Sequence, residues 1–105
     1  MIVFLPFVEP GRSWTVHGVT TPDMRAVRRQ LRSGDRGAFA AMYADNVDTV
    51  FTLAHRLTGD WASAEDVVSE TFLVAWRSRA QLSDDDRPLR PWLLGIAARQ
   101  ALNSR

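Results

Sequence analysis

Residues 64–76 read AEDVVSETFLVAW, and this stretch decides the fold class. Its apolar residues recur at steps of three and four, the spacing of one face of an α-helix. The acids Glu65, Asp66 and Glu70 are too many for a helix that is buried on all sides. The stretch therefore predicts an amphipathic helix with an acidic side and an apolar side. We expect the apolar side to consist of Ala64, Val67, Val68, Thr71, Phe72 and Ala75.

Capping residues divide the rest of the chain into further helices. The predicted N-caps are Asp23, Asp35 and Asp60, and the predicted helix ends are Ser33-Gly34 and Gly59. SDDDRP (residues 83–88) reads as a loop, and Pro91 suits the first turn of a last helix. We predict an all-α, compact bundle of three to four helices over residues 23–105, and an irregular arm over residues 1–22. The expected core includes Phe39, Tyr43, Val50, Val67, Phe72, Trp92 and Ile96.

Composition excludes several classes of protein. The 105 residues contain no cysteine, which rules out a disulfide framework and a thiol nucleophile. The apolar residues 2–8 are too few to span a membrane and form a poor secretory signal, so we expect a cytoplasmic protein without membrane insertion. The net charge of +1 is uneven: seven acids against two arginines give −5 over residues 35–76, and each flank carries +3. This layout suggests two partners of opposite charge, although solvated faces are the alternative.

No group of residues predicts catalysis, a cofactor or a metal site. Asp66 and Glu70 share a helix face and could bind a divalent cation, but no histidine lies near them in sequence. His55 is expected to be a surface or packing histidine. We predict that the chain is not an enzyme and keep a metal-dependent helical enzyme as a third alternative.

Two helices carry candidate binding surfaces instead. Asp66, Ser69, Glu70 and Leu73 turn away from the apolar side of their helix, where they could meet a basic partner helix. The alternative is that the acids only add solubility and favour the helix dipole. The last helix combines Trp92, which could simply anchor the core, with residues suited to phosphates and bases. These residues are Arg87, Arg90, Arg99, Gln100 and Asn103.

Three segments in order resemble region 2 of sigma-70-family factors, most closely the extracytoplasmic-function (ECF) group. They are GDRGAF with the following MY (residues 34–43), RLTGDWASAEDVVSETFLVAW (56–76) and RPWLLGIAARQAL (90–102). The resemblance implies docking on the clamp coiled coil of RNA polymerase and recognition and melting of the promoter −10 element, with flipped non-template bases held in a pocket. By position it implies polymerase contacts at Asp66, Ser69, Glu70, Leu73 and Trp76. It implies DNA contacts at Arg87, Arg90, Trp92, Arg99, Gln100 and Asn103.

Departures from the family pattern keep a second hypothesis open. Ser69 stands where glutamine is usual, Arg99 where asparagine is common, and the acidic loop where aromatic residues are usual. The second hypothesis is a helical interaction domain, a sigma-like regulator or decoy, that binds only protein. We expect Asp84–Asp86 to point away from DNA or toward an inhibitor, and an anti-sigma factor is a candidate partner. The family also implies a second, −35-binding domain, which these residues do not contain.

Overall fold

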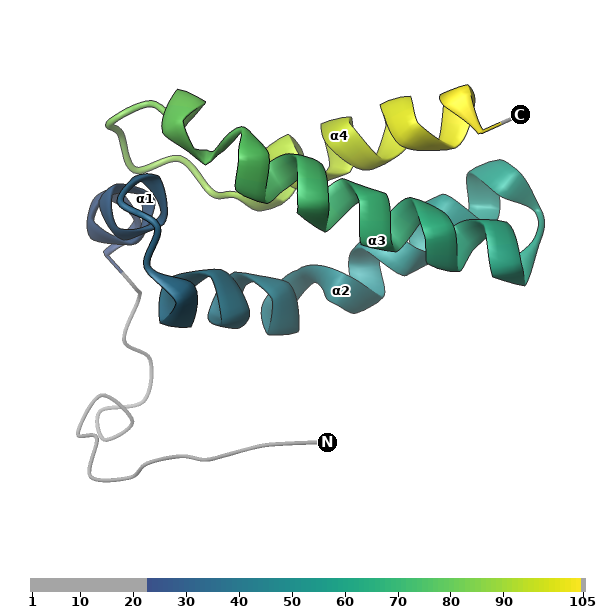
Figure 1. The fold of residues 1–105 in the computed structure, drawn as a ribbon, viewed down its shortest axis with the longest axis horizontal. Helices are drawn as coiled ribbons and strands as arrows, with labels where there is room; N and C mark the ends of the chain where they lie inside the picture. Colours follow the sequence, from purple (N-terminus) through teal and green to yellow (C-terminus); the bar gives the residue numbers. More distant parts are fainter. Residues whose placement is uncertain (1–22, 105) are drawn as a thin grey trace.

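The structure, a computed structural model, describes residues 23–104, and these are almost entirely helical. The elements are α1 (Met24–Arg32), α2 (Arg36–Thr58), α3 (Trp61–Arg77), the short 3₁₀ helix η2 (Arg79–Gln81) and α4 (Arg90–Asn103). α2, α3 and α4 lie lengthwise, with α3 antiparallel to the other two (Figure 1). α1 crosses one end of this group, where the loop between η2 and α4 also lies (Figure 1). The prediction of an all-α bundle is confirmed.

Aspartate caps set the helix starts as the sequence predicts. The carboxylates of Asp23, Asp35 and Asp60 accept hydrogen bonds from the amides of Ala26, Ala38 and Ser63, respectively. Each bond occupies an amide that the first helical turn leaves without a partner. At the end of α2, Gly59 adopts a left-handed conformation (φ +72°), which lets the chain turn into α3.

The core lies where α2, α3 and α4 meet. α3 buries the six residues expected for its apolar side, and α4 buries Leu93, Ile96, Ala97 and Ala101. Thr71 is completely buried, and its hydroxyl donates to the Val67 carbonyl at 2.7 Å, so this polar group leaves no unsatisfied donor. Of the expected core residues, Val50, Val67, Phe72 and Ile96 are buried.

Three expected core aromatics lie at the edge of the core. Phe39 and Trp92 are partly buried. Tyr43 is 43% exposed, so its prediction as a core residue is wrong. Its ring does pack on Phe72, with 4.7 Å between ring centroids. The helical period placed Tyr43 on the side of α2 that meets α3, but packing on α3 alone leaves its ring partly exposed.

Phe72 offers a test of the core because it packs against aromatic rings of α2 and is 5% exposed. We expect Phe72→Ala to lower the free energy of unfolding by about 3–5 kcal/mol, through lost apolar transfer and the cavity left behind. Leu73→Ala, at the adjacent exposed position, is the matched control and should change it by no more than about 0.5 kcal/mol. Urea denaturation of both variants measures this, and a loss below about 1 kcal/mol for Phe72→Ala would contradict the packing described.

Candidate functional site

The solvent-facing side of α3 carries most of the predicted polymerase-contact residues. Asp66, Ser69 and Leu73 are exposed along one face, and Glu70 beside them is half-buried. Leu73 is 42% exposed, which is high for a large apolar side chain. This side of α3, defined by these four residues, is called the α3 stripe below. It presents two carboxylates next to an uncovered apolar group.

Trp76, the fifth predicted polymerase contact, lies at the edge of this stripe. Ten residues separate it from Asp66, which places it about 80° farther round the helix. The Trp76 ring packs edge-on against Phe39, with 5.2 Å between ring centroids. The Arg79 guanidinium carbon lies 4.0 Å from the centroid of the Trp76 ring. Arg79 also donates to the Trp76 carbonyl at 2.8 Å. Trp76 is thus held in a stack that joins α2, α3 and η2.

A shallow groove joins the α3 stripe to α4. It has a volume of about 240 Å³ and is lined by Asp66, Val67, Glu70, Gln100, Asn103 and Ser104. Gln100 and Asn103, predicted to contact DNA, therefore lie beside acids predicted to contact polymerase. This proximity could not be predicted from the sequence, because it depends on how α4 packs on α3.

A second pocket lies at the start of α4. Its volume is about 380 Å³, and its walls come from α1, from the segment after η2 and from the first turn of α4. The lining residues are Arg28, Gln81, Leu82, Ser83, Arg87, Pro88, Pro91 and Trp92. Two arginines, an amide and a half-buried indole therefore surround one opening. We call it the Trp92 pocket. Of the predicted DNA contacts, it contains Arg87 and Trp92.

The side chain of Arg87 is bound within its own loop. Its Nη2 lies 2.9 Å from Asp85 Oδ2 and donates to Ser83 Oγ at 2.7 Å, and its backbone amide donates to Asp85 Oδ1 at 3.0 Å. Hydrogen bonds from the Arg87 side chain, then from Ser83 and the Arg87 amide, hold the pKa of Asp85 well below its ordinary value. The same carboxylate raises the pKa of Arg87.

Arg90 and Arg99 do not share a face of α4. Nine residues correspond to about 180° of helix rotation, so their side chains leave the helix on opposite sides. Arg90 turns toward α2, where it donates to the Asn46 side-chain oxygen and the Asp45 carbonyl, both at 2.9 Å. Arg99 is exposed. One face of α4 therefore cannot present both arginines, predicted to contact DNA, to the phosphates of one strand.

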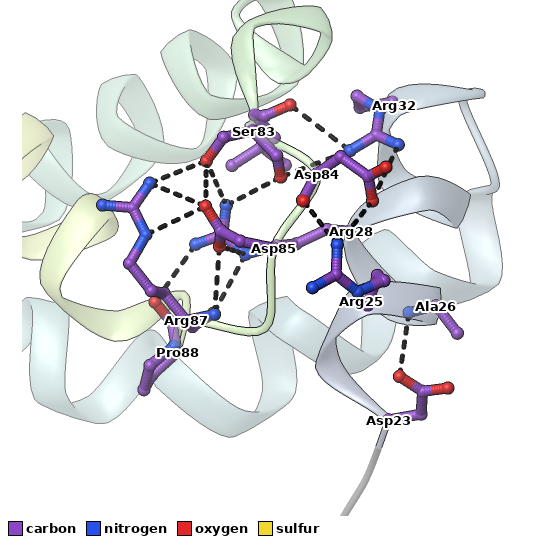
Figure 2. Close-up of polar contacts among 11 residues, drawn as sticks. Asp23, Arg25, Ala26, Arg28, Arg32, Ser83, Asp84, Asp85, Arg87 and Pro88 are labelled. Atoms are coloured by element: carbon purple, nitrogen blue, oxygen red, sulfur yellow. Dashed lines mark hydrogen bonds and ion pairs between the residues drawn. The ribbon is translucent and has the colours of Figure 1, made fainter.

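Asp84 and Asp85 pair with arginines of α1, and Asp85 also pairs with Arg87 of its own loop (Figure 2). The expectation that Asp84–Asp86 point away from DNA or toward an inhibitor stays a prediction. His55 is exposed and stacks on Phe51, as a surface packing residue. Within residues 23–104 no cluster of side chains suited to a metal ion is found, and no helix there is long and apolar enough to cross a membrane. The expected arm over residues 1–22 lies outside the described residues.

Comparison with known proteins identifies the family. The model of sigma-70 region 2 matches residues 42–105, which is more than half of the chain. The chain belongs to the sigma-70 region 2 family. This match spans most of α2, all of α3 and α4, and the loop that forms the Trp92 pocket.

Curated relatives of this sigma-70 region 2 chain include two ECF sigma factors. The ECF RNA polymerase sigma factor SigL of Mycobacterium tuberculosis is 42% identical over 65 residues, which cover 62% of this chain and 37% of SigL. The ECF RNA polymerase sigma factor SigK of Mycobacterium ulcerans is 31% identical over 94 residues, covering 90% of this chain and 46% of SigK. The matched residues thus span less than half the length of either relative. No solved structure matches the chain.

The low pKa of Asp85 predicts how this sigma-70 region 2 loop responds to acid. Because the folded-state pKa lies below the ordinary value of 3.8, the stabilisation is complete above that value and is lost as the pH falls toward the folded pKa. We expect the amide resonance of Arg87, which donates to Asp85, to show no transition near pH 3.8. An NMR titration of the full chain measures this. Asp85→Asn should shift that resonance already at neutral pH, and a wild-type transition centred near 3.8 would contradict the bonding described.

Proposed function

We propose that this domain is the polymerase-docking and promoter-melting part of a sigma factor. Its family membership and its similarity to ECF RNA polymerase sigma factors support a role in transcription initiation. The observation that carries the docking half is the α3 stripe, with an exposed Asp66 and a half-buried Glu70 beside an uncovered Leu73. A basic helix of the polymerase clamp coiled coil would pair with the acids, and the Leu73 side chain would be buried in the interface. Catalysis belongs to the polymerase in this proposal.

The DNA half of the proposal uses the Trp92 pocket and the exposed side of α4. A base can be read in a protein pocket only after it leaves the stack, and pockets for flipped bases combine ring stacking with hydrogen bonds to the base edge. Trp92, Gln81 and Arg87 offer both kinds of contact around one opening. Arg99 and Gln100 extend from the same helix and would meet the backbone and base edges of the non-template −10 strand. Arg90 and Asn46 would instead hold α4 in place.

A second candidate function is favoured by one specific observation. Arg87 and Arg90 are exposed, but the guanidinium groups of both bind other groups of the protein, which lowers the positive charge available for phosphates. A sigma-like regulator that binds only protein would need no such charge. The two functions differ in whether the polymerase complex of this chain binds the −10 single strand.

The docking proposal predicts a strong effect of charge reversal on α3. The folded double variant Asp66→Arg/Glu70→Arg should place like charges against the basic partner, costing several kcal/mol and slowing association with polymerase core. Glu65→Arg is the matched control for the single variant Asp66→Arg, because the same charge change on the same helix lies about 100° from Asp66. Pull-down of polymerase core measures binding, and circular dichroism measures folding. Undiminished binding by the folded double variant would overturn the docking surface, and equal losses in Glu65→Arg and Asp66→Arg would indicate a net-charge effect.

The DNA proposal predicts separable effects at Arg99 and Gln100. Each single-strand phosphate contact contributes about −0.7 to the log–log salt slope of binding, so Arg99→Ala should flatten the slope by roughly 0.7. Gln100→Ala should reduce binding of the preferred −10 sequence more than binding of a scrambled one. Arg56→Ala, an exposed arginine of α2, is the control and should leave both quantities unchanged. The measurement is fluorescence anisotropy of −10 single strands with the polymerase complex across a salt series. Unchanged slope and unchanged preference would favour the protein-only function.

A further inference from the structure

Arg28 of α1 is a buried cation. Among residues 23–104, the partners of its side chain all lie in one loop that is distant in sequence. The residue is 3% exposed. Its Nε donates to the Arg87 carbonyl at 2.9 Å, its Nη1 to the carbonyl and hydroxyl of Ser83 at 3.3 and 3.4 Å, and its Nη2 to the Pro88 carbonyl at 3.4 Å. The Asp85 carboxylate lies 3.4 Å from Nε. These partners follow Arg28 by 55 to 60 residues, so α1 and the loop are joined only by folding.

Two further arginines of α1 bind the same loop from the rim. Arg25 and Arg32 lie on the same side of α1 as Arg28, at steps of three and four (Figure 2). Arg25 donates to the Asp84 carbonyl at 2.6 Å, and Arg32 donates to the carbonyls of Leu82 and Ser83, each at 3.3 Å. The ion pairs of both with Asp84 are solvent-exposed and add little. Arg28 is therefore the central contact, and the outer two guide the loop toward it.

Because Arg28 is buried, its guanidinium must keep its hydrogen-bond acceptors. A buried guanidinium without its acceptors is strongly unfavourable, because its charge would lose both water and partners. The carbonyls of Ser83, Arg87 and Pro88 cannot all move away unless α1 moves with them. Ser83, Arg87 and Pro88 also line the Trp92 pocket, as does Arg28 itself. The residue that fixes the loop thus fixes one wall of the pocket.

We propose that Arg28 is a positioning residue for the Trp92 pocket and that α1 thereby sets which base the pocket accepts. The inference rests on the proposed function, since it assumes that this pocket receives a promoter base. With 3% of its surface exposed, Arg28 is poorly placed to neutralise a phosphate. It acts through the loop backbone, which sets how Arg87 and Ser83 stand opposite Trp92. Loss of Arg28 should then reduce base selectivity more than overall affinity for single-stranded DNA.

The first experiment measures the loop without DNA. Arg28→Ala removes all the contacts. Arg28→Lys keeps the charge, but its donors all lie on one nitrogen and cannot reach the three separate carbonyls that the planar guanidinium binds. Arg29→Ala is the matched control, an exposed arginine of the same helix. In the full chain, hydrogen exchange of residues 82–89 should be about ten-fold faster in Arg28→Ala, with Arg28→Lys between it and wild type. Exchange in α2 and α3 is the internal reference for folding. Unchanged loop exchange in Arg28→Lys would overturn the inference.

The second experiment measures selectivity in the polymerase complex. The probe is a single-stranded DNA library randomised over six consecutive positions, captured by the complex of each variant with polymerase core and sequenced. We expect wild type and Arg29→Ala to select the same bases, and Arg28→Lys to lose about ten-fold preference at one or two positions while capturing similar amounts of DNA. A loosened loop with full selectivity would overturn the inference and leave the proposed function standing. A wild type that captures DNA without base preference, or captures none, would overturn the proposed base recognition itself, whereas the exchange experiment would still decide the Arg28 contact.

Discussion

The apolar side of α3 has to be covered by two other helices at once. Val67, Thr71 and Ala75 are almost completely buried, and burial of this kind requires packing from both flanks, which α2 and α4 supply. A domain of this size has a small core, so most of its apolar helix faces are needed to form that core. The solvent-facing side of α3 contains the α3 stripe, and Trp61, Ala62, Glu65 and Arg77 are exposed on the same helix. The proposed docking surface is therefore the part of the helix that the core cannot use.

Much of the helical framework follows from local sequence. Each predicted cap corresponds to an observed one, because an aspartate carboxylate needs only the amide three residues ahead. The buried side of α3 was predictable residue by residue, since a helical period reports directly which side faces the core. Tyr43 marks the limit of that reasoning. Periodicity gives the direction of a side chain but not whether a neighbouring helix extends far enough to cover it.

The long-range polar contacts could not be predicted. Arg28, Arg87 and Arg90 look alike in a chain whose basic residues are all arginine, yet one is buried, one is bound within its loop and one joins α4 to α2. The partners of Arg28 are mostly backbone carbonyls, which every residue carries and which leave no mark in the sequence. The proximity of Gln100 to Glu70 has the same origin, because it arises from the packing of α4 on α3. The sequence thus identifies candidate binding residues, but it does not show which of them lie together in the fold.

Arg28 and Arg90 anchor the two ends of the segment that leads from the loop of residues 83–88 into α4. Arg28 binds residues 83–88 from α1, and Arg90, at the start of α4, is bound to Asn46 of α2. Both contacts form when the chain folds, so the conformational entropy of ordering this segment is lost at that stage. A ligand that enters beside Trp92 then meets a wall that is already ordered, and more of its interaction energy remains as affinity. Under the proposed function, in which the pocket receives a single base, preorganisation would favour a binding loop whose anchoring contacts are complete before the ligand arrives.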